Sequence, residues 1–242
     1  MSEAGGAALG ACESGAEGGR DLRCSPDTAA VGEGQRLGSE PLNAFFGRQR
    51  RFAVAFSGGC DSAYLLAAAK DAGCDVAAYL VKTAFQPAFE LDDARRVADA
   101  LGVPLRVLEA DVLAEADICA NAPDRCRLCK RFIFATVRES AAGDGFDVLA
   151  DGTNASDDPA TRPGFLSLAE AGVVSPLRRA AMTKADVRAA LAALEVRCGL
   201  GAGALLSDKP SFPCLAVYVG EGSRIDEPAL RRAAVERGVL FE

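Results

Sequence analysis

The chain has 242 residues, half of them apolar and a quarter charged, which suits one α/β domain with a small appendage and argues against wholesale disorder. Its formal charge of −7 disfavours a protein that coats nucleic acid or an anionic membrane through bulk charge. The sequence contains no histidine, which excludes Ser-His-Asp triads, Cys-His dyads and His-based zinc or iron sites. Any soft-metal site must therefore be built from thiolates.

Cysteine use bears on the compartment. Nine cysteines are many for this length, but the number is odd and the chain is not small, so a secreted disulfide framework is disfavoured. Reactive or metal-binding thiols in a reducing environment fit better, and we expect a cytoplasmic protein. The sequence has no uncharged apolar run of about 18 residues, so we expect no membrane association.

The first 42 residues differ in character from the rest. Residues 1–42 are rich in Gly, Ala, Ser and Glu without an apolar period, which predicts a disordered tail. From residue 43, short apolar runs alternate with segments of helical periodicity. In chain order, the pattern predicts strands at 52–56, 76–81, 104–108 and 146–150, and helices at 63–72, 90–101, 130–140, from a capping box of Thr183 with Asp186 onward, and at 227–237.

This alternation predicts the architecture. Strands that are apolar on both faces and joined by helices form a parallel sheet covered on both sides. Right-handed crossovers then give a doubly wound sheet. We therefore predict an α/β fold with a doubly wound, mostly parallel sheet over 43–205, followed by a short C-terminal segment over 206–242. In such sheets, ligands bind beyond the carboxyl ends of the strands.

A glycine-rich loop follows the first predicted strand. Residues 57–62 read Ser-Gly-Gly-Cys-Asp-Ser and lead into a helix. Glycines let the backbone approach a ligand closely, and the helix N-terminus favours an anion. Asp61 suits such a site if it faces a Mg²⁺ that bridges phosphates. The alternative is an ordinary Gly-rich turn, which a bare Gly-Gly pair would favour but the full string does not.

The only Cys-x-x-Cys pair, Cys126 with Cys129, follows the third predicted strand. Positive charge favours the thiolate, the form that binds metal or attacks. A redox pair, half of a zinc site and two ordinary cysteines all remain open on these residues alone. The basic neighbours of the pair are Arg125, Arg127, Lys130 and Arg131.

The glycine-rich loop resembles the PP-loop of the N-type ATP pyrophosphatases, and it lacks the Walker pattern. Over residues 52–216 the chain further resembles the LarE sacrificial sulfur transferases. This second resemblance is more specific than that of the loop alone, because several short sequence blocks match in the same order. The blocks are SGGxDS, NxPDRCxxCK, DGTNxxD, RPG, SPL, TKxxVR and DKPSxPCLA.

The resemblance implies a Rossmann-like PP-loop fold and a reaction. A substrate carboxylate attacks the α-phosphate of ATP, pyrophosphate leaves, and the adenylylated carboxylate becomes a thiocarboxylate. The family substrate is pyridinium-3,5-biscarboxylic acid mononucleotide, a precursor of the nickel-pincer nucleotide. Some members sacrifice one cysteine, and others hold a [4Fe-4S] cluster on three. With Cys126, Cys129 and Cys214, this chain resembles the cluster type, in which an open iron position would carry the extra sulfide.

The resemblance also implies roles for individual residues and for the cofactors ATP and Mg²⁺. Lys130 would neutralise charge on the α-phosphate, and Asp61 would contribute to Mg²⁺. Cys214, Lys130 and Asp151 are the candidate catalytic residues, Asp151 by positioning metal or nucleotide. Arg162 is a candidate for a substrate phosphate. The pyrophosphate would be held by Ser57, Gly58, Gly59 and Ser62.

Two departures bear on the substrate. The Ser-Arg pair that usually follows the family cysteine is missing here, because the residues after Cys214 read Leu-Ala-Val-Tyr-Val. We also expect 206–242 to be a truncated version of the family's second domain. The alternatives are another PP-loop ligase that amidates a substrate or thiolates tRNA, and an inactive relative that binds only nucleotide or an iron–sulfur cluster.

The remaining cysteines have plainer interpretations. Cys60 is expected to fill the core, and Cys74 and Cys198 to be structural or incidental, as are Cys12 and Cys24 in the tail. A zinc site of Cys119 with the three candidate ligands is a minor alternative. As partners we expect a small nucleotide substrate and a second copy of the chain, and no nucleic acid.

Overall fold

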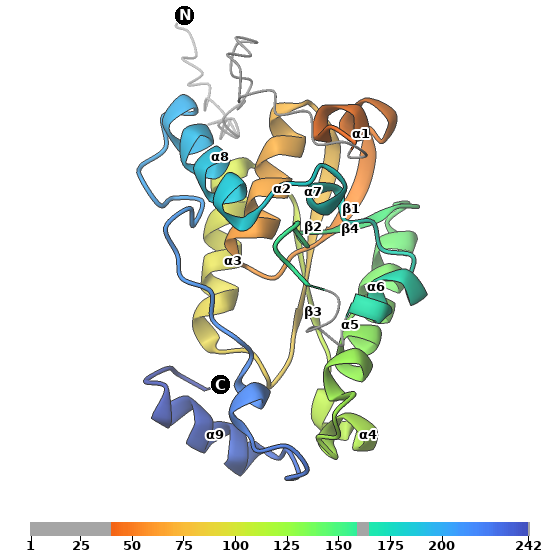
Figure 1. Cartoon of the computed structure of the whole chain (residues 1–242), viewed down its shortest axis with the longest axis vertical. Helices are drawn as coiled ribbons and strands as arrows, with labels where there is room; N and C mark the ends of the chain where they lie inside the picture. The colour runs from red at the N-terminus through yellow and green to blue at the C-terminus, as the bar shows by residue number, and fades with distance from the viewer. Residues whose placement is uncertain (1–39, 159–164, 242) are drawn as a thin grey trace, which may run out of the picture.

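The computed structural model describes residues 40–158 and 165–241 (Figure 1). Its centre is a sheet of four parallel strands in the order β3-β2-β1-β4. The predicted parallel α/β sheet is therefore confirmed. The strands are β1 (Arg51–Ala55), β2 (Asp75–Lys82), β3 (Leu105–Glu109) and β4 (Leu149–Asp151).

Helices cover both faces of the sheet, which confirms the doubly wound arrangement. Phe52 and Val54 of β1 point into one apolar layer, whereas Ala53 between them points into the other. The first layer packs against α1 (Leu42–Arg48), α2 (Cys60–Asp71), α3 (Ala88–Leu101) and α8 (Lys184–Arg197). The second packs against α5 (Arg125–Gly143) and α6 (Phe165–Glu170).

The direction of winding reverses between β1 and β4. From β1 the chain proceeds through α2 to β2 and through α3 to β3, and then returns to place β4 on the other side of β1. The loops that leave β1 and β4 thus diverge from neighbouring strand ends, which is where open α/β sheets bind ligands. These two loops nevertheless approach closely, because a Cβ on Gly152 would lie 2.6 Å from the Ser62 nitrogen.

Two helix starts differ from the prediction. Helix α2 begins at Cys60 instead of residue 63, so Asp61 lies in its first turn. Helix α5 begins at Arg125 instead of residue 130, so the cysteine pair lies inside the helix. Asp and Ser suit a first helical turn as well as a loop, and no breaker follows Pro123, so both helices extend further back. The predicted capping box at Thr183 is confirmed.

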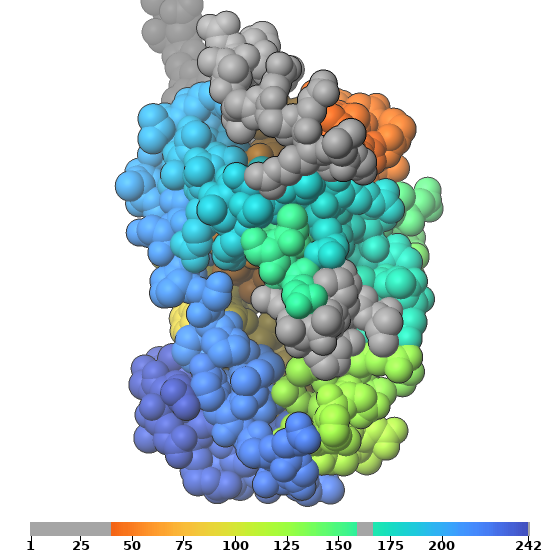
Figure 2. All heavy atoms as spheres, in the orientation of Figure 1, coloured from red at the N-terminus to blue at the C-terminus, as the bar shows by residue number. Residues whose placement is uncertain are grey.

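The C-terminal segment has its own apolar cluster. Leu215, Ile225 and Leu230 pack with Phe85 and Ile118 into a third group of buried side chains. Figure 2 shows this segment (blue) at one end of the molecule beside the start of α5 (yellow-green). The elements not yet named are α4 (Ala116–Cys119), α7 (Pro176–Arg179), α9 (Glu227–Glu236) and the short 3₁₀ turns Val112–Ala114 and Leu215–Tyr218.

The prediction of a disordered tail concerns residues that lie outside the described part of the chain, apart from residues 40–42. Within the described residues, no helix has the length and apolarity that crossing a bilayer requires.

The contact between the two loops predicts an unequal effect of two glycine substitutions. In Gly152→Ala, the new Cβ would also lie 2.9 Å from the Asp61 carbonyl carbon, and backbone atoms yield only at a cost. We expect this variant to lose about 1–3 kcal/mol of unfolding free energy. The matched control is Gly143→Ala at the end of α5, where a Cβ meets nothing within 4 Å. Urea unfolding of both variants measures the difference, and equal stability would contradict the close contact.

Candidate functional site

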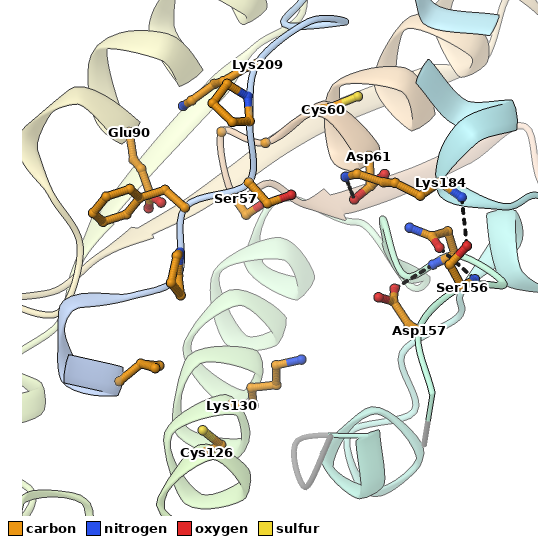
Figure 3. Close-up of a pocket in the computed structure, with 18 residues that line it drawn as sticks. Ser57, Cys60, Asp61, Glu90, Cys126, Lys130, Ser156, Asp157, Lys184 and Lys209 are labelled. Carbon is orange, nitrogen blue, oxygen red and sulfur yellow. Dashed lines mark hydrogen bonds and ion pairs between the residues drawn. The ribbon is translucent and has the colours of Figure 1, made fainter. Parts of the chain in front are cut away.

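A cavity of about 690 Å³ opens at the carboxyl ends of the strands (Figure 3). The loop after β1 forms one wall and α5 forms another. The loop after β4, the first turns of α3 and α8, and the segment before Cys214 line the rest. The sequence-predicted residues that line it are Ser57, Gly58, Gly59, Asp61, Cys126 and Lys130.

The loop after β1 is shaped for close approach of a ligand. Gly58 has φ +69°, and a Cβ there would lie 2.6 Å from the Glu90 carbonyl oxygen, so only glycine fits. Helix α2 starts directly after Gly59, and the N–H groups of its first turn have no carbonyl partner inside the helix. An anion placed against this turn would receive those N–H groups and the positive end of the helix dipole.

Ser62 braces the loop. Its side chain is 3% exposed, and its hydroxyl donates to the Gly59 carbonyl at 3.1 Å and lies 3.2 Å from the Ser57 hydroxyl. It is not among the residues that line the cavity, in contrast to Ser57. The structure thus places Ser57 toward the cavity and Ser62 behind it.

Asp61 has one satisfied and one unsatisfied oxygen. Its Oδ2 pairs with the Lys184 ammonium at 2.5 Å, as Figure 3 marks. Its Oδ1 is buried without a hydrogen-bond partner in the described structure. An unpaired buried carboxylate oxygen is unfavourable, and oxygen ligands of this kind are what Mg²⁺ takes. The residues present therefore fit a magnesium ion beside the loop.

Lysines from three elements face the cavity. Lys130 projects from α5, one helical turn after Cys126 and on the same face. Lys184 comes from the first turn of α8, and Lys209 from the segment before Cys214. Sequence reasoning assigned a role only to Lys130. Lys184 and Lys209 lie in the TKxxVR and DKPSxPCLA blocks, but nothing local in the sequence shows that the topology brings them to this cavity. Three ammonium groups suit a polyanionic ligand, although the acids Asp61, Glu90 and Asp157 line the same cavity.

Asp151 lies behind the cavity. Its side chain accepts hydrogen bonds from the hydroxyls of Ser175, at 2.6 Å, and of Thr153. Burial raises its pKa, although those hydrogen bonds and the Lys130 charge oppose the rise. Asp151 is not a lining residue, so its predicted role with metal or nucleotide stays a prediction. Arg162 lies outside the described residues.

The three predicted cluster ligands are neighbours but differ in access. Cys126 faces the cavity, whereas Cys129 is buried, and desolvation together with the nearby Cys214 raises its pKa to about 12. Cys214 is half-buried, and its sulfur accepts a hydrogen bond from the buried Arg125 at 3.9 Å. Among the described residues, no three Cys, Asp or Glu side chains are arranged to hold a metal ion. The [4Fe-4S] cluster therefore stays a prediction.

Three of the other described cysteines, Cys60, Cys74 and Cys119, are buried. Cys60 is buried in the core, as predicted, and it also borders the cavity. The Cys74 thiol points at the carbonyls of Phe46 and Gln49. Cys119 points at the carbonyls of residues 112 and 113, which gives the zinc alternative no support.

Glu90 is a site residue that the sequence analysis did not single out. It lies in the first turn of α3, where its backbone meets Gly58 and its side chain lines the cavity (Figure 3). Burial raises the pKa of this carboxyl to about 7. The negative charge of Asp93 adds to the rise, whereas the positive charges of Lys209 and Lys82 oppose it. The first-turn acid of the predicted helix was a signal, but the neighbours that bury it come from distant segments.

The chain is similar to several known proteins. A family model described as queuosine biosynthesis protein QueC matches residues 51–126, the span from β1 to Cys126. The chain is 31% identical to the uncharacterized protein slr1717 of Synechocystis sp. over 80% of the chain and 69% of that protein. It is 34% identical to pyridinium-3,5-bisthiocarboxylic acid mononucleotide synthase of Lactiplantibacillus plantarum, over 58% of the chain and 51% of that enzyme.

A further group of relatives is more distant. The tRNA-specific 2-thiouridylase MnmA of Frankia alni is 33% identical over 45% of the chain and 37% of its own length. The chain thus spans 51% of the Lactiplantibacillus plantarum synthase and 37% of the Frankia alni thiouridylase.

The raised pKa of Glu90 predicts how nucleotide binding depends on pH. Below a pH of about 7 this carboxyl is mostly neutral, and above it the carboxylate repels an anion in the same cavity. We expect ATP affinity to fall several-fold as pH rises through about 7, and the fall to be lost in Glu90→Gln. Calorimetric titration checks this, with Glu139→Gln on the exposed side of α5 as control. The same pH dependence in Glu90→Gln as in the parent chain would contradict the assignment.

Proposed function

The chain belongs to the LarE-type family of PP-loop, ATP-dependent sulfur transferases, and from this membership we propose that it converts a carboxylate of a small pyridinium nucleotide into a thiocarboxylate. The substrate class is pyridinium-3,5-biscarboxylic acid mononucleotide, whose sulfur-bearing product leads to the nickel-pincer nucleotide. The observation that carries the proposal is one cavity that joins the anion-binding turn after β1, three lysines and the thiol of Cys126.

The first step is adenylylation. A substrate carboxylate oxygen attacks the α-phosphorus of ATP, the bond to the β-phosphate breaks, and pyrophosphate leaves with the bonding electrons. The carboxylate is already a nucleophile, so this step needs no general base, which agrees with a chain that has no histidine. The leaving pyrophosphate would rest on the first turn of α2, where Ser57 adds a hydroxyl.

Lysines stabilise charge in this step. Lys130 projects from α5 into the cavity, and we assign it the charge that develops on the α-phosphate. Lys184 begins α8 beside Asp61, and we assign it to the departing pyrophosphate. Asp61 would hold Mg²⁺ through its unpaired Oδ1. When bound, that ion would neutralise phosphate charge.

The second step is transfer of sulfur to the activated acyl group. A sulfur nucleophile attacks the acyl carbon, and AMP leaves. Cys126 faces the cavity, and Cys214 ends the segment that forms one wall, so sulfur would enter from the side of α5. In one route the Cys214 thiolate attacks, and its Cβ–Sγ bond then breaks with loss of the Cα proton, which leaves a thiocarboxylate and dehydroalanine. In the other, Cys126, Cys129 and Cys214 would together hold a cluster that supplies sulfide. Their thiolate chemistry suits such a cluster, although their described positions do not form a metal site.

A small molecule fits better than tRNA as the substrate. The cavity of about 690 Å³ is of a size for small ligands, and the chain as a whole has a charge of −7. We also propose a reducing cytoplasm as its compartment, which agrees with the free thiols of Cys60, Cys74 and Cys119.

The direct test is product analysis. The chain, ATP, Mg²⁺ and pyridinium-3,5-biscarboxylic acid mononucleotide are incubated anaerobically, and the small molecules are examined by mass spectrometry. We expect a product in which sulfur replaces a carboxylate oxygen, together with AMP. A parallel incubation with tRNA should yield no thiolated nucleoside. Thiolated tRNA without the pyridinium product would overturn the substrate assignment.

Removal of Lys130 should slow adenylylation. Loss of one charge-stabilising donor lowers turnover by about 100-fold or more, so we expect that decrease in pyrophosphate release from Lys130→Ala. Lys70→Ala on α2, outside the cavity, is the matched control. Pyrophosphate release within about threefold of the parent chain in Lys130→Ala would remove this residue from the mechanism.

Iron analysis separates the two sulfur sources. If the three cysteines hold a cluster, anaerobically reconstituted protein contains iron and sulfide, and both Cys126→Ala and Cys214→Ala lose most of it. Cys198→Ala, next to the C-terminus of α8, is the control and retains it. If the parent chain binds no iron and still forms product, with dehydroalanine at position 214, the cysteine itself is the donor.

A further inference from the structure

One buried acid lies outside the cavity and organises one of its walls. Glu195 of α8 is 2% exposed. It faces the segment of residues 203–214, here called the strap, which follows α8 and ends at Cys214. The strap supplies a continuous part of the cavity lining: Lys209, Pro210, Ser211, Phe212 and Pro213. Figure 3 shows it as the pale blue chain that passes Lys209 on the side of the cavity nearest Glu90.

The Glu195 carboxylate gathers the first part of the strap. It accepts hydrogen bonds from the backbone N–H of Leu205 at 2.7 Å and of Gly203 at 3.0 Å, and from the Ser207 hydroxyl at 2.6 Å. Burial alone would raise the pKa of Glu195, but these hydrogen bonds outweigh it, so the pKa is lowered. The group is therefore a carboxylate at neutral pH.

This carboxylate is unfavourable for α8 itself. It lies near the C-terminus of the helix, where the macrodipole disfavours negative charge, and it is withdrawn from water. Among the described residues, the strap's N–H groups and the Ser207 hydroxyl donate hydrogen bonds to it, which compensates for this position. The fold of α8 gains nothing from a buried acid at this position. We therefore assign the Glu195 carboxylate to holding the strap.

The next part of the strap, from Ser207 to Lys209, is held by contacts with Arg188 and Asp93. Arg188, two turns earlier on α8, donates to the carbonyls of Ser207 at 3.0 Å and of Lys209 at 2.5 Å. Lys209 then pairs with Asp93 of α3 and lies 4.5 Å from the centroid of the Phe89 ring.

The end of the strap is held against the same helix. Phe212 packs edge-to-face on Phe89, with the ring centroids 5.4 Å apart. The N–H of Leu215, directly after Cys214, donates to the Phe85 carbonyl at 2.8 Å. The chain from Glu195 to Cys214 is thus anchored at successive points on α8, α3 and the loop after β2.

We propose that Glu195 is a positioning residue, which fixes the strap and thereby sets Cys214 and Lys209 in register with the anion-binding turn after β1. The inference rests on the proposed function, because it holds that sulfur transfer depends on where the strap places Cys214 and Lys209. Adenylylation depends mainly on the turn and on Lys130, so a loose strap should impair sulfur transfer more than pyrophosphate release.

The first test is structural and needs no activity. In Glu195→Gln the side chain keeps its size but loses charge and one acceptor, and bonds to charged groups are the stronger ones. We expect amide hydrogen exchange in residues 203–207 to accelerate at least tenfold, while exchange in β1 stays unchanged. Glu236→Gln, an exposed acid near the end of α9, is the matched control. Unchanged exchange in the strap overturns the proposal whether or not the chain is active.

The second test measures the ratio of thiocarboxylate formed to pyrophosphate released. We expect this ratio to fall about tenfold in Glu195→Gln, with pyrophosphate release within about twofold of the parent chain. Ser207→Ala, which removes one bond to the acid, should give a smaller fall and guards against a variant that fails to fold. An equal loss of both activities, or acceleration of exchange in β1 as well as the strap, would show a general structural role and overturn the proposal.

Discussion

The structure depends on a place where backbone must meet backbone with no side chain between. At the carboxyl ends of β1 and β4, Gly58 lies against the Glu90 carbonyl and Gly152 against the first turn of α2. A Cβ at either position would displace one of the loops. Because both are glycine, the start of α2 is held between two strand ends and is open to a ligand on its N-terminal side. This arrangement provides the anion site on which the proposed chemistry depends.

Several lysines line the site although the chain as a whole is acidic. The sequence as a whole is acidic, with a formal charge of −7, yet lysines from α5, α8 and the strap converge on one cavity. Three acids, Asp61, Glu90 and Asp157, line the same cavity, and the first two differ in environment. Asp61 pairs with Lys184 and keeps one oxygen unpaired, whereas Glu90 is desolvated and titrates near neutrality. A polyphosphate with a divalent cation would satisfy the lysines and the unpaired oxygen together.

The sequence predicted the framework well because the framework obeys local rules. Apolar runs bounded by turn residues placed β1, β2 and β3 within one residue of their observed bounds, and Gly102 and the Thr183 capping box marked helix ends as expected. The fourth strand begins three residues later than predicted, since Phe146 packs on Tyr79 outside the ladder. These patterns depend on neighbours in sequence, and local chemistry decides them.

The site was predicted only in part, for a different physical reason. The loop at residues 57–62, Lys130 and Cys126 carry recognisable motifs and do line the cavity, apart from Ser62, which braces the loop. Glu90 and Glu195 have no motif, and their roles come from segments that only the folded topology brings near. Helical periodicity marks position 195 as buried beside Leu191, but nothing in the sequence shows that the strap supplies its hydrogen-bond donors.

The central claim is that the turn after β1 holds pyrophosphate as the leaving group. Phosphorus NMR of the nucleotide products, with Mg²⁺ and the pyridinium nucleotide present, tests it most directly. The account predicts that ATP is converted to AMP and pyrophosphate in equal amounts, and only when the carboxylate substrate is supplied. Formation of ADP and inorganic phosphate would show cleavage at the terminal phosphate and would contradict the account.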